Sequence, residues 1–340
     1  MLAVTHSLTL GSLRYDSHLA ALTVRRGVLP IVDRLDASLP RGVRVDAAAG
    51  DPVELTLDGG DGSEVVFTGT VTSVRRDLAT IVVVAHGAGH TLARYRPSVS
   101  LEQVTAGDVV TQLCGDAGVS VAEVESGPTL ARYVALARAT ALEEVVRLTH
   151  LSAATATVTA TDELRTSTEP AAERRLRWGR EPLTVTVAGA AAATGAFVVA
   201  GEGAGEPGAS NGLWPTDDFW AGGAPAPGPQ ARWRVDHDVR STSDATTAGD
   251  AWAARDAEAR TPVRLRSWLL PALGPDDSVE IAEGPDDLGL AAIRVRQVVH
   301  RLQPGRPAVT DIWGHAAGAG AAGGAGGLLG ALASAVGSLL

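Results

Sequence analysis

The amino-acid sequence predicts a mainly β protein that carries a small α+β insert. Short segments with alternating or continuous apolar residues, separated by turn residues, fill residues 1–95. Two segments with helical apolar spacing and helix-capping residues lie within residues 96–168. Strand-like segments return in residues 169–313. These three observations divide the chain into two β regions with the insert between them.

The first β region, residues 1–95, is expected to hold several short strands. Residues 53–57 alternate strictly between apolar and polar side chains, and residues 81–84 form a continuous apolar run. Between them, residues 58–62 read Asp-Gly-Gly-Asp-Gly and supply a turn, because glycine adopts positive φ at no steric cost. Short strands separated by such turns are typical of a closed barrel or a sandwich.

The insert, residues 96–168, is predicted to contain two helices among strands. Thr105 and Asp108 can cap a first helix that ends near Gly115 or Gly118. Thr140 and Glu143 have capping-box spacing, in which each side chain satisfies a free backbone amide of the other residue.

The second β region, residues 169–313, is interrupted by a long Gly/Pro-rich stretch at residues 201–230, which is predicted to be a surface loop. A helix is expected from Ser243 or Asp244 to about Arg260, and strands follow it. Residues 314–340 are predicted to be a flexible Gly/Ala-rich tail with a short apolar end.

The apolar end of this tail is the candidate partner-docking segment. Its apolar residues fall close to helical spacing: Leu328, Leu329, Leu332, Val336, Leu339 and Leu340. Burying several of them would hold a protein neighbour, but the segment is too short to anchor in lipid alone. The alternative is a passive tail.

Composition excludes several classes of function. The formal net charge is -10, and no basic stripe stands out, so nucleic-acid binding is not expected. The single cysteine, Cys114, rules out an intrachain disulfide. Residues 1–6 lack the features of a signal peptide, and no apolar run reaches the roughly 20 residues of a membrane span. Synthesis and folding are therefore expected in the cytoplasm, without stable membrane insertion.

Two motifs raise the question of catalysis. Ser210 lies in a G-x-S-x-G sequence, but it is flanked by Gly-rich sequence rather than by a strand and a helix. His237 lies between Asp236 and Asp238, in a segment of mixed charge that favours an exposed strand. We therefore expect no catalytic residue.

Metal and cofactor sites are not expected either. His86 and His90 are four residues apart, but they lie in a Gly-rich turn with no third ligand nearby. The pairs Asp276-Asp277 and Asp286-Asp287 could bind calcium, yet each follows a proline, which favours a hairpin tip. The G-x-G-x-x-G run at residues 318–323 has no preceding strand, as a dinucleotide site requires.

All seven tryptophans lie in the second half of the chain: Trp178, Trp214, Trp220, Trp233, Trp252, Trp268 and Trp313. Either they are anchors of protein interfaces, or they fill barrel interiors that are otherwise lined by small residues.

The order of these segments resembles the hub family of phage tails, which includes the late control protein D type. The resemblance lies in the phrases Val66–Val71, Leu92–Arg96, Gly107–Val110, Ala141–His150 and Ala308–Trp313, and in the ending formed by Val295, Val298, Val299 and His300. It spans most of residues 1–313 and contains no catalytic signature.

The resemblance implies a homotrimeric baseplate hub. Each chain would carry two related β-barrel domains, residues 1–95 and 169–313, so that three chains present a pseudo-sixfold ring. Such a ring would adapt a hexameric tail tube to a trimeric spike, in a phage tail or in a contractile injection particle that can be released outside the cell. Inside such an assembly, the tail segment is expected to contact either the tape-measure protein in the tube lumen or the same segment of the other two chains, as a plug. The alternatives are a cell-wall hydrolase that uses Ser210 or His237, and a glycan-binding module at residues 105–150.

Overall fold

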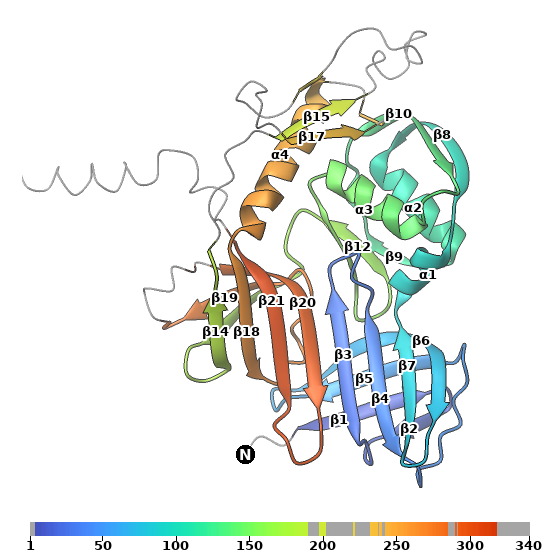
Figure 1. Cartoon of the computed structure of the whole chain (residues 1–340), viewed down its shortest axis with the longest axis vertical. Coiled ribbons are helices and arrows are strands. Elements are labelled where there is room, and N and C mark those ends of the chain that lie inside the picture. The colour runs from blue at the N-terminus through green and yellow to red at the C-terminus, as the bar shows by residue number, and fades with distance from the viewer. Residues whose placement is uncertain are drawn as a thin grey trace, which may run out of the picture.

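The computed structural model describes residues 4–189, 197–201, 220–221, 232–236, 238–239, 242–284, 290 and 292–317. It is mainly β, with four helices among these residues. Two β lobes lie side by side, and the helices lie over one end of them (Figure 1).

The first lobe is built from β1 (Thr5–Leu10), β2 (Leu13–Tyr15), β3 (Ala21–Gly27), β4 (Arg34–Pro40), β5 (Pro52–Asp58), β6 (Ser63–Arg76) and β7 (Thr80–His86). The long strand β6 pairs with β5 through its first half and with β7 through its second half. This change of partner curls the sheet around its own core, which contains Leu8, Leu35, Leu55, Phe67 and Val83.

The second lobe is built from β13 (Glu173–Arg177), β14 (Pro182–Val187), β18 (Pro262–Trp268), β19 (Ser278–Ala282), β20 (Ala292–Leu302) and β21 (Val309–Ala317). Its core is separate and contains Leu176, Leu265, Val279, Ile293 and Ile312. Because β21 continues to Ala317, residues 314–317, which were expected to belong to the Gly/Ala tail, are part of a strand.

One hydrogen-bonded sheet connects the two lobes. Strand β20 pairs with β3 in an antiparallel register that runs from Gln297 opposite Gly27 to Leu302 opposite Leu22. The strand order is β14-β18-β21-β20-β3-β4-β7-β6-β5-β1-β2, with β19 and β13 attached to β20. Two closed barrels were expected, but the described strands of the two lobes form a single open sheet, because the lobes pair with each other through β20 and β3.

The insert contains α1 (Ala88–Arg94), β8 (Ser98–Thr105), α2 (Ala106–Ala117), β9 (Val121–Glu123), β10 (Thr129–Leu136), α3 (Ala141–Leu151), β11 (Thr155–Val158) and β12 (Leu164–Ser167). Both predicted helix starts are confirmed. The capping box expected of Thr140 and Glu143 is present before α3, and Thr105 and Asp108, which were expected to cap α2, also form a capping box. These local caps explain why the sequence locates both helices.

Helix α1 was not predicted, because residues 86–90 were assigned to a turn. Its N-terminus is stabilised by a residue far away in the sequence: the Ala88 backbone N–H donates to Asp162 Oδ1 at 2.6 Å. The predicted later helix is confirmed as α4 (Thr242–Ala259), which packs beside β15 (Phe197–Gly201), β16 (Trp220–Ala221) and β17 (Arg232–Asp236). Among the described helices, none combines the length and the apolar character that crossing a bilayer requires.

A buried histidine makes the stability of the sheet depend on pH. His300, on β20, is fully buried, and its Nδ1 lies 3.0 Å from Thr310 Oγ1. Burial lowers its pKa to about 3. The unfolded chain binds a proton at this residue below about pH 6.5, whereas the folded chain does not until about pH 3. The contribution of His300 is therefore complete above pH 6.5 and is lost as the pH falls.

As the pH falls below 6.5, we expect His300 to lower the free energy of unfolding of the wild-type protein by up to about 1.4 kcal/mol per pH unit. His300→Asn removes the titrating group, so the variant should lose less. Denaturant unfolding at several pH values measures the difference. Burial raises the pKa of Asp33 to about 6, and this opposes the trend. Because Asp33 is present in both proteins, its effect cancels in the comparison. Parallel pH profiles would contradict the assignment.

Candidate assembly surface

The two faces of the shared sheet have opposite character. On β18, Val263 and Leu265 are buried, while Arg264 and Arg266, which alternate with them along the strand, are exposed. Directly opposed residues of neighbouring strands lie on the same face of a sheet, so the strand registers extend this exposed face across both lobes. We call it the polar face; it contains Thr23, Arg25, Arg34, Asp36, Ser38, Arg264, Arg266, Arg301, Asp311 and Trp313.

Ion pairs connect the strands on the polar face of the second lobe. Asp311 on β21 accepts two hydrogen bonds from Arg266 of β18, at 2.6 and 3.0 Å, and one from Arg301 of β20, at 3.2 Å. Burial opposes the ionisation of Asp311, but the hydrogen bonds from Arg266 and Arg301 hold its pKa below the usual value. One carboxylate therefore fixes the spacing of three strands.

The polar face carries excess positive charge. In the first lobe Arg34 donates to both carboxylate oxygens of Asp36, and these hydrogen bonds raise the pKa of Arg34. Arg25 lies directly opposite Arg34 on the neighbouring strand. In all, the polar face contains five arginines and two aspartates. Charged side chains at this density require hydration, so the polar face is suited to line a water-filled space rather than to pack against an apolar partner.

The sheet ends in a free edge at β14. This strand pairs only with β18, and its outer backbone groups have no strand partner among the described residues. Three large apolar side chains are exposed here: Trp178 by 39%, Leu183 by 40% and Trp268 by 43%. The Trp268 backbone N–H donates to the Glu181 carbonyl, which places it beside the turn that holds Trp178. An unprotected edge with apolar neighbours is a template for pairing with another chain.

The tryptophans whose side chains the structure describes are surface residues. Trp178, Trp233 and Trp268 are exposed, and Trp252 and Trp313 are half-buried beneath Arg234 and Arg264. The interpretation that tryptophans fill barrel interiors does not hold for these five. Nothing is described for Trp214 or for the side chain of Trp220.

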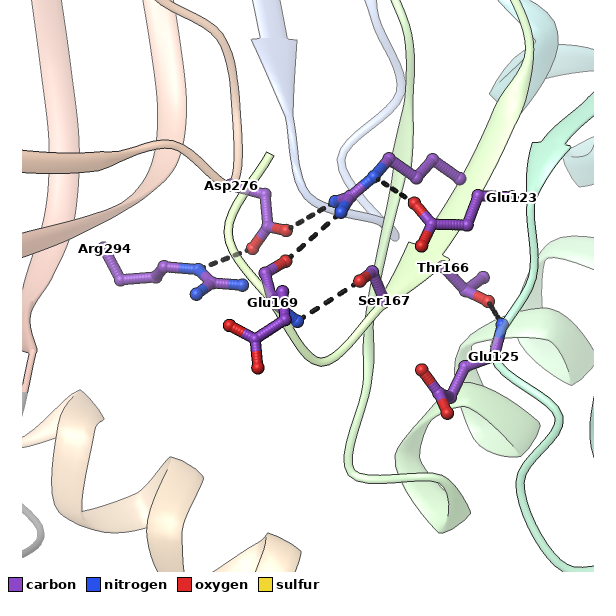
Figure 2. Close-up of polar contacts among 8 residues, drawn as sticks. Glu123, Glu125, Thr166, Ser167, Glu169, Asp276 and Arg294 are labelled. Atoms are coloured by element: carbon purple, nitrogen blue, oxygen red, sulfur yellow. Dashed lines mark hydrogen bonds and ion pairs between the residues drawn. The ribbon is translucent and has the colours of Figure 1, made fainter. Parts of the chain in front are cut away.

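A buried ion-pair network joins the insert to the second lobe (Figure 2). Asp276 is fully buried and accepts from Arg294 of β20 at 2.8 Å and from Arg165 of β12 at 3.2 Å. Arg165 also donates to Glu123 at 2.8 Å and to the Glu169 carbonyl at 3.3 Å. Burial raises the pKa of Asp276, and the two arginines oppose that rise. The network fixes how the insert sits on the sheet.

The expected hairpin tip at Asp276-Asp277 needs correction. The two residues do lie in a turn, but both are buried. Asp277 accepts from the Gly274 backbone N–H at 2.9 Å and lies 3.5 Å from Arg174. Their carboxylates are engaged by arginines and by backbone, so the pair holds the turn in place. The second pair, Asp286-Asp287, lies outside the described residues.

The histidine candidates are also held in structural contacts. The rings of His86 and His90 stack with centroids 4.7 Å apart, and His86 Nδ1 lies 2.9 Å from Thr72 Oγ1. Within the described ranges, no group of three or more His, Cys, Asp or Glu side chains is placed to hold a metal.

The carboxylates around His237 bind an arginine. Arg147 on α3 donates to Asp236 at 2.9 Å and lies 2.6 Å from Asp238. Asp236 and Asp238 therefore attach β17 and the residues after it to the insert. His237 and Ser210 lie outside the described residues, as do the run 318–323 and the candidate docking residues Leu328, Leu329, Leu332, Val336, Leu339 and Leu340.

Sequence reasoning missed the polar face. Its signal is present within single strands, as in the alternation of arginine with apolar residues along residues 262–268. What the sequence does not show is that β3 and β20 pair.

Comparison with solved structures shows a phage tail protein fold. The 43 kDa tail protein of prophage MuSo2 from Shewanella oneidensis matches with a TM-score of 0.66 and 14% identity, over 91% of this chain and 98% of that chain. A tail protein from Neisseria meningitidis MC58 matches with a TM-score of 0.68 and 13% identity, over 93% and 97%.

A third match is the E. coli c3393 protein, described as a component of the type VI secretion system with structural similarity to the T4 tail proteins gp27 and gp5. Its TM-score is 0.63 with 10% identity, over 91% of this chain and 76% of that chain. No family model and no curated protein sequence matches this chain. At these identities the likeness establishes the fold, and that fold agrees with the resemblance noted from the sequence.

Proposed function

We propose that this chain is the structural hub of a phage tail-like contractile injection particle. The observation that carries the proposal is the polar face, which extends over strands of both lobes, with the buried Val299 between Asp311 and Arg25, and ends at the free edge of β14. A sheet with one buried and one hydrated face is suited to the wall of a channel. The free edge offers the site at which the wall continues into a neighbouring chain.

Three copies would close the wall into a ring. A contact between the β14 edge of one chain and the first lobe of the next is heterologous, and heterologous contacts form rings when the rotation closes. Two lobes per chain then give six lobes around the axis, which matches a hexameric tail tube. The insert occurs once per chain and gives three copies, which matches a trimeric spike.

The proposed hub is not an enzyme and needs no cofactor. Asp236 and Asp238, the neighbours of His237 in the sequence, bind Arg147, which favours a structural role for that segment. The hub would be made and assembled in the cytoplasm with the tube and spike proteins, as part of a particle that can be released.

Co-purification tests this function. The chain, mixed with the tube and spike proteins encoded beside it, should elute with both in one complex and show no hydrolysis of cell-wall material. Elution with neither protein, or turnover of peptidoglycan, would contradict the proposal.

The C-terminal residues after β21 are proposed to contact the tape-measure protein in the lumen. Truncation after Ala317 leaves every strand of the sheet intact, whereas truncation after His315 would remove Ala316, which is buried in the second core. We expect the chain truncated after Ala317 to fold and trimerise but to retain less tape-measure protein in assembled particles. Pull-down from purified particles measures this, and unchanged retention would show that the tail is passive.

A further inference from the structure

The two ends of the shared sheet are unequal. At one end the insert covers the strands: β7 leads into α1, and the Leu29 backbone N–H donates to the Ala156 carbonyl at 2.9 Å. At the other end the strands finish in bare turns, and no described element covers them (Figure 1). The registers Leu302–Leu22, Ala21–Ser38 and Pro40–Thr80 place these turns side by side.

Arginines gather at this bare end. Arg75 and Arg76 lie at the end of β6, Arg41 follows β4, and Arg306 lies in the turn between β20 and β21; all four are exposed. We call them, with Leu78, the arginine rim. The Arg41 backbone N–H donates to the Ala79 carbonyl at 3.0 Å, and Arg76 donates to the Val45 carbonyl at 3.4 Å. These bonds hold the turn after β4 against the β6–β7 hairpin.

The rim is cationic on an acidic protein. The whole chain has a net charge of -10, yet no carboxylate in the described residues lies within 4.0 Å of the guanidinium of Arg41, Arg75, Arg76 or Arg306. Nearby Arg44 is already paired with Asp46 at 3.3 Å. Asp77 is the one acid within the β6–β7 turn. Four arginines that have no ion-pair partner among the described residues, on neighbouring turns, form a surface that attracts acidic partners.

An apolar side chain projects from the same surface. Leu78, at the tip of the β6–β7 hairpin, is completely exposed, the only large apolar residue so exposed in the described part of the chain. A single exposed leucine is ordinary on a protein surface. Here it stands between unpaired arginines, an arrangement that suits an interface with one apolar contact surrounded by charges.

We propose that the arginine rim is the docking surface for a protein ring with an acidic face, which within the proposed function is the tail tube. Both lobes contribute, since Arg75 and Arg76 come from the first lobe and Arg306 from the second. A trimer therefore repeats the rim around all six lobes. From β21 to β6 the rim spans five strand spacings, about 24 Å. The opposite end carries one insert per chain, so the partner with threefold symmetry is expected to bind at that end.

The test is a charge reversal with a matched control. The rim variant is Arg41→Glu, Arg75→Glu, Arg306→Glu; it spares Arg76, whose hydrogen bond to Val45 is structural. The control variant reverses three exposed arginines of the insert, Arg94→Glu, Arg132→Glu and Arg138→Glu. The probe is the assembled ring of the tube protein encoded beside this chain. Circular dichroism melting and sedimentation confirm that each variant folds and trimerises.

We expect the rim variant to bind the tube ring about tenfold or more weakly than the wild type, and the control to bind like the wild type. Wild-type binding should weaken as salt is raised, and the rim variant should lose that dependence. Leu78→Ser should weaken binding with the salt dependence unchanged, because it removes an apolar contact and no charge.

Failure of this inference can be told apart from failure of the hub proposal, on which it rests. A rim variant that trimerises, binds spike protein and binds the tube ring like the wild type would overturn the rim and leave the hub. Loss of tube binding in the control alone would also overturn it. The rim proposal would also be overturned if the wild-type chain bound anionic vesicles or DNA but did not bind the tube ring. A wild-type chain that neither trimerises nor binds tube or spike would overturn both proposals.

Discussion

Replacing Asp276 with asparagine is expected to lower the free energy of unfolding by about 3 kcal/mol. Both carboxylate oxygens of Asp276 accept hydrogen bonds, one from Arg294 and one from Arg165. Asparagine keeps one acceptor and turns an NH2 donor toward the other guanidinium. Among the described residues, Arg294 then loses its ion-pair partner, and Arg165 keeps only Glu123. Chemical denaturation of the wild type and the variant measures the difference.

Asparagine is the substitution that isolates the charge. Asp276 has φ of 71°, in the left-handed region that asparagine adopts more readily than alanine does. The matched control is Glu123→Gln, which removes the other carboxylate on Arg165. Because Glu123 is 56% exposed, this change should cost less than about 1 kcal/mol. Equal denaturation midpoints for the wild type and Asp276→Asn would show that the network does not attach the insert to the sheet.

Leu183→Lys on the free edge is expected to convert the trimer into monomers. Lysine on an edge strand places a charge where the neighbouring chain would pack, and desolvating it opposes association. Leu183 is 40% exposed in the single chain, so the fold itself should lose less than about 0.5 kcal/mol. Sedimentation velocity over a range of concentrations measures the change.

Leu136→Lys is the matched control for this edge. Leu136 is 71% exposed and lies on β10, which pairs only with β8 in the insert. The same change of side chain there should leave the trimer intact. A Leu183→Lys protein that remains trimeric would exclude β14 as the ring contact, and dissociation of both variants would show that the effect is not specific to that edge.

Local signals in the sequence were sufficient for part of the fold. The helices α2 and α3 were predicted because each capping box lies within four residues of chain. Helix α1 was missed because its cap, Asp162, comes from 74 residues further along the sequence. Several strands of the first lobe, such as β5 and β7, were predicted from alternating or continuous apolar residues, a signal that depends only on neighbouring residues, whereas β4 was not predicted.

The arrangement of the strands could not be read in the same way. Two related barrels were expected, and the lobes instead share one sheet because Leu22 to Gly27 of β3 pair with Gln297 to Leu302 of β20. Sequence alternation shows which face of a strand is buried, but not which strand lies next to it. The continuation of the polar face and of the arginine rim from one lobe to the other depends on that pairing. Asp276 shows the same limit, since Arg165 is 111 residues distant.

The mass of the wild-type chain in solution tests the central claim most directly. Sedimentation equilibrium at micromolar concentration should give three times the chain mass of 34.7 kDa. Images of the same sample should show a ring with six lobes around an open channel. A single 34.7 kDa species that persists when tube and spike proteins are added would contradict the account, because a monomer cannot join a sixfold tube to a threefold spike.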